Sequence, residues 1–295
     1  MAVTVENNKV TYRALLIGNE KYTDLSRLYS APNNVAAMKA LLKQSATAYR
    51  ITTVRDRTAN GIERAIAKAF ADADSNDISL FYYAGHGSID GSLLGVNNSR
   101  LSTGKLAAAL KAIPGKVIVI LDSCYSGTVI AVEGEDGELQ QDGVAPSGAG
   151  FGEAIVRALK SETVEDVWSN VANSAGELRT SKFVVLTSAS WSEESWNVRG
   201  NICGQQFGPK WASLMTRFLT LGAGWDLQND VKTTSEADAN HDKKLTLQEA
   251  AAYTGKWVTY WMKYVNFDQF GKFSGYEQHV CYWPTTGNPV LLQLK

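Results

Sequence analysis

Short apolar runs alternate along the chain with stretches in which apolar residues recur every three or four positions. The short runs have the length and β-branched content of buried strands, and the periodic stretches have the pattern of helices that bury one side. The predicted strands are 14–18, 51–54, 78–83, 117–121, 183–186 and a last one at 289–292. The predicted helices are 32–42, 58–70 and 103–112. This alternation predicts an α/β fold with a mostly parallel central sheet of about six strands and helices on both faces.

One segment, 127–182, interrupts the alternation between the strands at 117–121 and 183–186. Its first half, up to residue 150, is rich in Gly, Asp, Glu and Gln, which is typical of loops, and 151–171 has a helical pattern. Long connections inside a compact domain are usually functional or disordered. We therefore interpret 127–182 as an insertion or linker within a single domain that comprises residues 1–295.

The amino-acid composition and net charge argue against some classes of binding partner. Apolar residues make up 44% of the 295 residues and charged residues 20%, which is ordinary for a globular protein. The net charge of -1 without a basic run argues against nucleic acid, and no stretch has the length of a membrane span. The N-terminal residues lack the pattern of a signal peptide. We expect neither nucleic acid nor membrane as a partner, favour a monomer, and leave open a cytoplasmic protein or a secreted one whose leader is removed.

Two residues whose side chains could take part in catalysis, His86 and Cys124, each come just after the end of a predicted buried strand. Active sites of open parallel sheets lie beyond the carboxyl ends of the strands, so neighbouring strands would bring the imidazole and the thiol together. An imidazole can take the proton of the thiol, create the nucleophilic thiolate and return the proton to a leaving amine. Cys203 and Cys281 have no such setting, and the odd, irregularly spaced set argues against disulfides or a zinc site.

Glycines flank both of these residues. Gly85 and Gly87 lie on either side of His86, and Gly127 follows Cys124. Glycine lets a substrate approach the backbone closely. We expect the backbone N–H groups of Gly87 and Cys124 to face the oxyanion that develops during acyl transfer.

Two segments, YYAGHG at 82–87 and LDSCYSG at 121–127, resemble the active-site motifs of the caspase-like cysteine peptidases, most closely metacaspases and bacterial orthocaspases. The segments 14–19 and 184–190 resemble the first strand of that family and the strand and loop that line its substrate cleft. The resemblance covers about 12–189. It implies a caspase-like fold and a Cys124/His86 dyad that hydrolyses peptide bonds through an acyl-enzyme, without a metal in the chemistry.

The resemblance also implies a substrate preference. Metacaspase-like members cleave after Arg or Lys, and one carboxylate of their acidic S1 pocket lies two residues before the nucleophile, here Asp122. Asp122 could instead orient the cysteine loop. A second pocket Asp of the family corresponds here to Asn34, a departure that weakens the basic preference, and Ser188 is a further expected S1 residue. Trp191, Glu193 and Glu194 follow the fifth predicted strand and are either further pocket residues or ordinary loop residues.

Caspase-like enzymes are often activated by a cut between the strand that carries the cysteine and the next strand, which is where 127–182 lies. With a basic preference, the candidate self-cleavage sites are Arg157, Lys160, Arg179 and Lys182. The alternative is a lid that is never cut, as in single-chain orthocaspases.

The segment 238–249 carries oxygen-bearing residues at the spacing of an EF-hand calcium loop. The candidate Ca²⁺ ligands are Asp238, Asn240, Asp242, Lys244, Thr246 and Glu249. Lys243 replaces the usual glycine of the sharp turn, so the loop could instead only cap the helix that begins near Glu249. The sequence leaves calcium binding and a helix cap as equal alternatives.

These features favour a cysteine endopeptidase that acts on peptides or proteins without a catalytic cofactor. One alternative is a catalytically silent caspase homologue that acts as an interaction or calcium-responsive module. A peptide ligase that uses the same residues is a third possibility.

Overall fold

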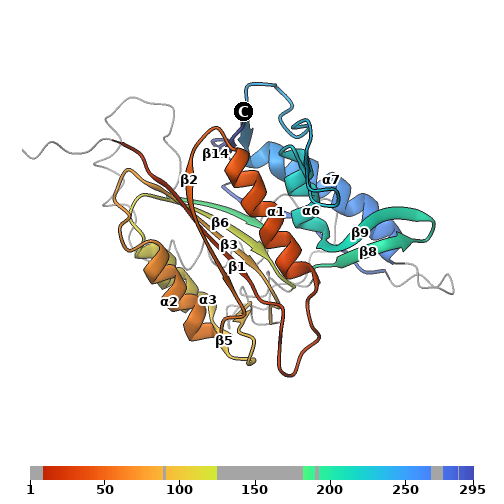
Figure 1. Cartoon of the computed structure of the whole chain (residues 1–295), viewed down its shortest axis with the longest axis horizontal. Coiled ribbons are helices and arrows are strands. Elements are labelled where there is room, and N and C mark those ends of the chain that lie inside the picture. Colours follow the sequence, from red (N-terminus) through yellow and green to blue (C-terminus); the bar gives the residue numbers. More distant parts are fainter. Residues whose placement is uncertain (1–8, 89–90, 125–181, 190–192, 267–274, 285) are drawn as a thin grey trace, which may run out of the picture.

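The apolar runs of the sequence form a central sheet in the computed structural model, which describes residues 9–88, 91–124, 182–189, 193–266, 275–284 and 286–295. The strands of this sheet are β1 (Tyr12–Gly18), β2 (Tyr49–Arg55), β3 (Ile78–Ala84), β6 (Lys116–Asp122), β7 (Phe183–Thr187) and β13 (Cys281–Trp283). Their order is β13-β7-β6-β3-β1-β2, and β13 alone is antiparallel to its neighbour. The prediction of a mostly parallel sheet of about six strands is confirmed (Figure 1).

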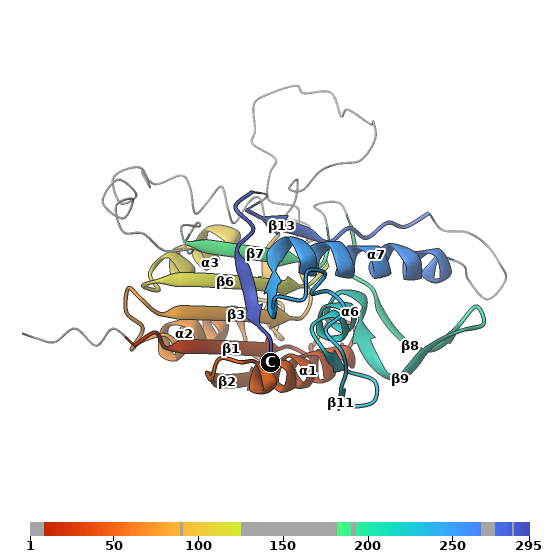
Figure 2. The same cartoon turned by 90° about the horizontal axis from the view of Figure 1, so that it is seen from above.

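Helices cover both faces of the sheet. One face carries α1 (Ser30–Gln44), α6 (Leu214–Gly222) and α7 (Leu247–Val265), and the other carries α2 (Ala59–Ala69) and α3 (Thr103–Lys111) (Figures 1 and 2). Successive side chains of a strand point to opposite faces, so Leu80 and Tyr82 pack with the first set while Phe81 and Tyr83 pack with the second. Burial on both faces explains why β1, β3, β6 and β7 are continuous apolar runs.

The remaining described elements are short and lie outside this sheet. They are the hairpin of β8 (Asn197–Ile202) and β9 (Gln205–Ser213), and the pairs β4 (Leu93–Leu94) with β5 (Arg100–Leu101), β10 (Trp225–Asp226) with β11 (Val231–Lys232), and β12 (Lys244–Thr246) with β14 (Val290–Gln293). The strand predicted at 289–292 is therefore present as β14, and it pairs with β12 rather than with the central sheet. The sequence pattern did not predict the β8–β9 hairpin or α6.

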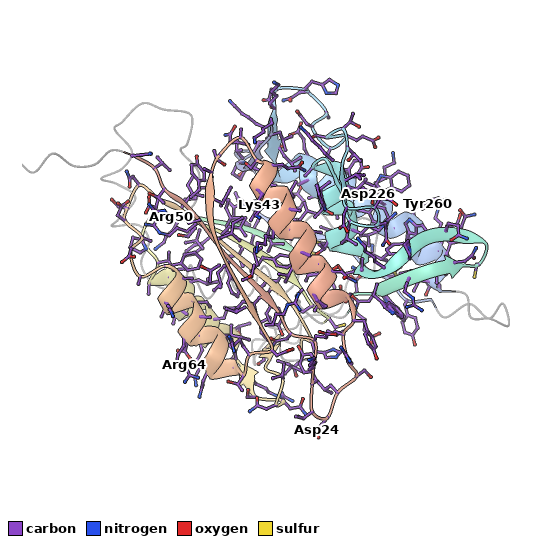
Figure 3. All side chains as sticks on the ribbon, in the orientation of Figure 1. Asp24, Lys43, Arg50, Arg64, Asp226 and Tyr260 are labelled. Carbon is purple, nitrogen blue, oxygen red and sulfur yellow. The ribbon has the colours of Figure 1, made fainter. Side chains whose placement is uncertain are left out.

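Several charged side chains lie on the outer surface of this arrangement. Lys43, Arg50 and Arg64 are exposed and project away from the sheet and helices (Figure 3). Within the described ranges, no helix is both long and apolar enough to cross a membrane.

Candidate active site

The parallel register of β3 and β6 brings the two motifs to one edge of the sheet. Ala84 lies opposite Asp122 in this register, and His86 and Cys124 each follow two residues later. The two loops also touch, because a Cβ atom on Gly87 would lie 2.0 Å from the backbone oxygen of Cys124. Only glycine can therefore occupy position 87 in this arrangement.

The imidazole of His86 is half-buried and has a defined hydrogen-bond partner. Its Nε2 lies 2.8 Å from the carbonyl oxygen of Ser26. A carbonyl can only accept, so Nε2 carries the hydrogen and Nδ1 is the basic nitrogen of the neutral ring. Burial lowers the pKa of His86, and the carbonyl of Ser26 partly opposes this shift. The imidazole is therefore neutral, and able to accept a proton, at neutral pH.

The thiol of Cys124 is also protonated at neutral pH. Its pKa is raised to about 11, mainly by burial and also by the negative charges of Glu194 and Asp122, while the backbone of Ser195 acts against these effects. Cys124 Sγ lies 3.4 Å from the carbonyl oxygen of Ser195. The two groups thus start as neutral thiol and neutral imidazole rather than as an ion pair.

This protonation state predicts slow alkylation of Cys124. In a Cys203→Ser/Cys281→Ser variant, we expect its reaction with iodoacetamide to rise roughly tenfold per pH unit, because only the thiolate reacts. The rise should continue towards pH 11, whereas a cysteine in a short model peptide, the control, should level off near pH ~8.5. Mass spectrometry measures both rates, and a plateau for Cys124 as early as that of the peptide would contradict the prediction.

Asp122 ends β6 in a fully buried position and accepts several hydrogen bonds. The donors are the Ser213 hydroxyl, the Thr216 hydroxyl at 2.5 Å, the Ser195 hydroxyl at 3.3 Å, the Asn34 amide at 3.3 Å and the Tyr82 hydroxyl at 3.4 Å. Burial raises the pKa of Asp122, and the four hydroxyl donors act against this shift. The carboxylate is thus held by uncharged donors.

A narrow pocket with a cavity volume of about 10 Å³ lies beside this carboxylate. Its polar lining comes from Ser30 and Asn34 in the first turns of α1, Asp122 at the end of β6, and Ser195 and Asn197 from the segment before and at the start of β8. Cys124 lines the same pocket. The structure therefore brings Cys124, Asp122 and Asn34 together around one pocket.

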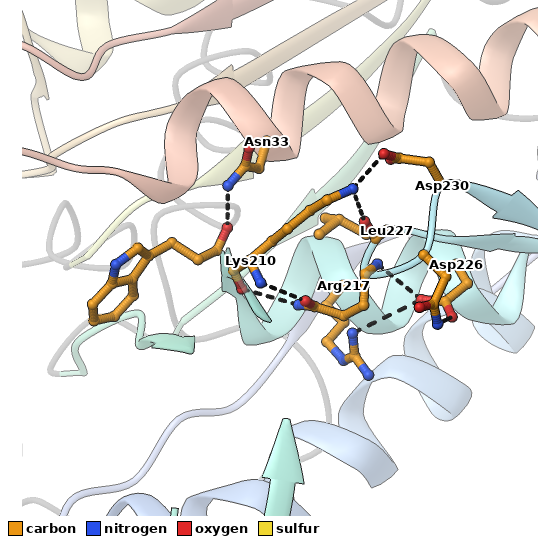
Figure 4. A network of polar contacts seen from close by, with 9 residues as sticks. Asn33, Lys210, Arg217, Asp226, Leu227 and Asp230 are labelled. Atoms are coloured by element: carbon orange, nitrogen blue, oxygen red, sulfur yellow. Dashed lines mark hydrogen bonds and ion pairs between the residues drawn. The ribbon is translucent and has the colours of Figure 1, made fainter. Parts of the chain in front are cut away.

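A polar network fixes the elements that surround the pocket (Figure 4). The Asn33 amide on α1 donates to the carbonyl of Trp211 on β9 at 2.8 Å. On the other side of β9, the Gln228 side chain exchanges two hydrogen bonds with the backbone of Lys210, at 2.8 and 3.1 Å. The Asn33 bond ties α1, which carries Asn34, to β9, which ends at Ser213, and Asn34 and Ser213 both donate to Asp122.

Sequence reasoning missed Ser195, Asn197, Ser213 and Thr216. The only local signal is that Ser213 precedes an apolar helical segment, as N-caps do, and its hydroxyl indeed accepts the backbone N–H of Thr216 at 3.1 Å. No feature of the sequence around Ser213 indicates that its hydroxyl also donates to Asp122.

Other predicted residues have different surroundings. The Ser188 hydroxyl accepts the N–H of Ser123 and donates to the carbonyl of Ser123, both at 3.1 Å, so it braces the turn before Cys124. Glu193 accepts the backbone N–H of His279 at 2.7 Å and pairs with His279 Nδ1 at 2.5 Å. The Lys182 ammonium donates to the carbonyl of Lys111 at 2.8 Å. Trp191, Arg157, Lys160 and Arg179 lie outside the described residues, as does most of 127–182.

One group of possible metal ligands occurs among the described side chains. Glu193, Glu277 and His279 place their ligand atoms within 4.8 Å of one another. The Glu193–His279 ion pair accounts for this grouping, since the Glu193 carboxylate raises the pKa of His279.

The loop at 238–249 has the internal hydrogen bonds of an EF-hand loop. The Asp238 carboxylate accepts the N–H groups of Asp242 and Lys243 at 3.2 and 3.0 Å, and Asp242 accepts that of Lys244 at 2.8 Å. Lys243 adopts a φ of 64°, the left-handed conformation that a glycine usually provides at this turn. Carboxylate and amide oxygens are the type of ligand that suits a hard cation such as Ca²⁺. The carboxylate of Glu249 also caps α7, through a capping box with Thr246.

Calcium binding by this loop stays a prediction. At millimolar Ca²⁺ we expect the Tm to rise by several degrees, because a ligand that binds only the folded state stabilises it by about 2.7 kcal/mol at 100 times its Kd. Differential scanning fluorimetry in Ca²⁺, Mg²⁺ and EGTA measures the shift. Asp242→Asn should weaken it while leaving the Tm in EGTA nearly unchanged, with Asp24→Asn as the matched control. Equal Tm values in Ca²⁺ and EGTA would leave the helix cap as the role of this loop.

Comparison with known proteins adds the family context. A family model described as the caspase domain matches residues 11–236. Among solved structures, the crystal structure of caspase-1 from Spodoptera frugiperda superposes with a TM-score of 0.55 at 11% identity, over 98% of this chain and 93% of that chain. This likeness concerns the fold. No curated protein sequence matches the chain significantly.

Proposed function

Because the chain belongs to the caspase domain family, we propose that it is a cysteine endopeptidase with Cys124 as nucleophile and His86 as general acid and base. Membership of the family supports a function of the cysteine-peptidase type in general. The observation that carries the specific proposal is the convergence of His86 and Cys124 at the ends of two paired parallel strands, beside a pocket that Cys124 lines.

In the proposed reaction, His86 Nδ1 takes the proton of the Cys124 thiol as the sulfur attacks the carbonyl carbon of the scissile bond. The oxyanion of the tetrahedral intermediate accepts hydrogen bonds from the backbone N–H groups of Gly87 and Cys124. His86 then returns the proton to the leaving amine, and an acyl-enzyme thioester remains. A water molecule, deprotonated by His86, hydrolyses this thioester and regenerates the thiol. This chemistry needs no metal or cofactor.

We propose a preference for Arg or Lys at the P1 position, as in metacaspase-like enzymes. The support is the carboxylate of Asp122 in a pocket that Cys124 also lines. A carboxylate that faces a guanidinium forms a strong charge-assisted hydrogen bond. Ser195 donates its hydroxyl to the same carboxylate, so a P1 side chain would have to displace this hydroxyl to reach Asp122.

The substitution Asn34→Asp is expected to sharpen this preference. Asn34 lines the pocket, and its amide donates to Asp122 at 3.3 Å, so the change adds a second carboxylate beside the first. We expect the ratio of kcat/KM for P1 Arg over P1 Gln peptides to rise about tenfold, equivalent to ~1.4 kcal/mol. Asn60→Asp adds the same charge at an exposed position of α2, on the other face of the sheet, and is the matched control. An equal rise in both variants would show a general charge effect rather than a pocket effect.

Fluorogenic peptides that end in Arg, Lys, Asn or Asp test the proposed function, with Cys124→Ala as control. Hydrolysis of Arg or Lys peptides that is lost in the control supports both the peptidase and the pocket. Cleavage only after Asn or Asp would refute the basic preference. If no peptide is cut while the insertion is intact, a silent homologue or an uncut zymogen is favoured.

Self-processing within 127–182 is part of the proposal, at Arg157, Lys160, Arg179 or Lys182. Intact mass measured over time, for the wild type and the Cys124→Ala variant, identifies any cut and shows whether Cys124 makes it. A single intact mass in an active preparation would favour an enzyme that needs no processing.

A further inference from the structure

Tyrosine hydroxyls contact both polar backbone atoms of His86. The N–H of His86 donates to the hydroxyl of Tyr22 at 2.8 Å, and the hydroxyl of Tyr83 donates to the carbonyl of His86 at 3.0 Å. The two hydroxyl oxygens lie 3.3 Å apart. Tyr22 belongs to the loop between β1 and α1, whereas Tyr83 belongs to β3, so this contact joins two separate parts of the chain.

The hydrogens of these groups can be assigned consistently. The Tyr22 hydroxyl accepts from the N–H of His86 and donates to Tyr83, and the Tyr83 hydroxyl shares its single hydrogen between the carbonyls of His86 and of Leu94 in a three-centre bond, the latter at 2.8 Å. Burial raises the pKa of Tyr22 to about 12, so this hydroxyl keeps its proton at neutral pH. The result is a chain of hydrogen bonds, called the relay below, that starts at the N–H of His86, passes through the hydroxyls of Tyr22 and Tyr83, and ends at the carbonyl of His86.

Tyr22 also contacts the imidazole itself. Its ring lies edge-on to that of His86, with 4.5 Å between the ring centroids. The same loop supplies the Ser26 carbonyl that accepts from Nε2. The loop is anchored at its start, where the Asn19 amide donates to the carbonyls of Arg57 and Leu94 at 2.9 and 3.0 Å. One anchored loop thus holds the backbone N–H, the ring face and Nε2 of His86.

The relay explains the glycine that precedes His86. A Cβ atom on Gly85 would lie 2.3 Å from the hydroxyl oxygen of Tyr83 and 2.7 Å from that of Tyr22. Both distances are far below van der Waals contact, so any side chain at position 85 would expel the two hydroxyls. The position of both tyrosine hydroxyls therefore depends on a glycine at position 85.

We propose that Tyr22 and Tyr83 are positioning residues that set the orientation of His86 and thereby keep Nε2 at the Ser26 carbonyl, which fixes the tautomer, a role that rests on the proposed peptidase function. We expect Tyr22 to contribute more to the position of His86 than Tyr83 does, because its hydroxyl accepts the hydrogen bond of the His86 N–H and its ring also packs on the imidazole. The carbonyl of His86 accepts the N–H of Leu94 at 3.0 Å as well, so loss of the Tyr83 hydroxyl leaves this carbonyl bonded. Substitution at Tyr22 should therefore have the larger effect.

The test uses Tyr22→Phe, Tyr83→Phe and the double variant. Tyr253→Phe is the control, since it loses a hydroxyl bond to Glu236 at 3.0 Å on another part of the surface. We expect kcat to fall roughly 10-fold to 100-fold in Tyr22→Phe, and less in Tyr83→Phe, because small misplacements of a reacting group are costly. The double variant should resemble Tyr22→Phe. KM should stay within about twofold, because the substrate pocket is not altered.

A second readout does not require turnover. The chain has three histidines, so ¹⁵N-histidine NMR resolves each imidazole, and His86→Gln assigns the signal of His86. The wild type should show the single tautomer with hydrogen on Nε2, and Tyr22→Phe should show a mixture of tautomers. The proposal requires both changes, so an unaltered His86 signal or a kcat within about twofold of the wild type overturns it. If the wild type cleaves no peptide, the proposed peptidase function fails, and the NMR result alone decides the role of the tyrosines.

Discussion

Cys124→Ala and His86→Gln are each expected to lower kcat for an Arg peptide by at least about 10³-fold, and the double variant should be no slower than the worse single one. The first change removes the nucleophile, and the second removes the base that activates it. Because burial raises the pKa of Cys124 to about 11, very little thiolate exists at neutral pH without the imidazole. The two residues therefore act as a unit, and their effects should not add.

Single-turnover kinetics on purified variants measure these rates, with Cys281→Ser as a control for general loss of a thiol. Thermal unfolding of each variant checks that the fold is intact. If His86→Gln keeps more than about a tenth of the wild-type rate, His86 is not the general base, because general acid–base catalysis contributes 10²-fold or more. If the double variant is much slower than either single one, the two residues act independently.

Asp122→Ala is expected to lower the free energy of unfolding by about 3 kcal/mol. The carboxylate is fully buried and accepts bonds from Ser213, Thr216, Ser195, Tyr82 and Asn34, so its removal leaves buried donors without an acceptor and creates a cavity. Some of these hydroxyls can pair again, as the 2.6 Å contact between Tyr82 and Thr216 shows, which limits the loss.

Urea unfolding followed by fluorescence measures this change, with Asp24→Ala as the matched control. Asp24 lies at an exposed loop tip (Figure 3), so its substitution should change stability by less than about 0.5 kcal/mol. Asp122→Asn keeps the shape and removes one acceptor, so its stability should fall between that of the wild type and that of Asp122→Ala. A loss below about 1 kcal/mol in Asp122→Ala would mean that the hydroxyls re-pair or bind water, and that this carboxylate does not organise the pocket.

The β8–β9 hairpin and α6 show why the sequence pattern did not predict every element of the fold. Gly208 in β9 has a φ of 129°, and the pairing of β8 with β9 shifts register around Gly200, so the regular alternation that identifies a strand is broken. Most residues of α6 are buried, so it lacks the exposed polar side that marks a surface helix in a sequence. Yet β8 supplies Asn197 to the pocket, and Ser213 and Thr216 donate to Asp122, so the elements that the sequence did not predict contribute to the pocket lining and to the Asp122 bonds.

The sequence by itself determined the parallel sheet, the helices on both its faces, and the placement of His86 and Cys124 just beyond the ends of two neighbouring strands. These features follow from local pattern, because buried parallel strands must be continuous apolar runs and their carboxyl ends meet at one edge. Only the tertiary structure decided which groups hold His86 and Asp122. Ser213 and Thr216 lie 91 and 94 positions from Asp122, and Tyr22 lies 64 positions from His86. A hydrogen bond between such distant residues leaves no period or spacing in the chain, since it depends on how separately formed elements pack.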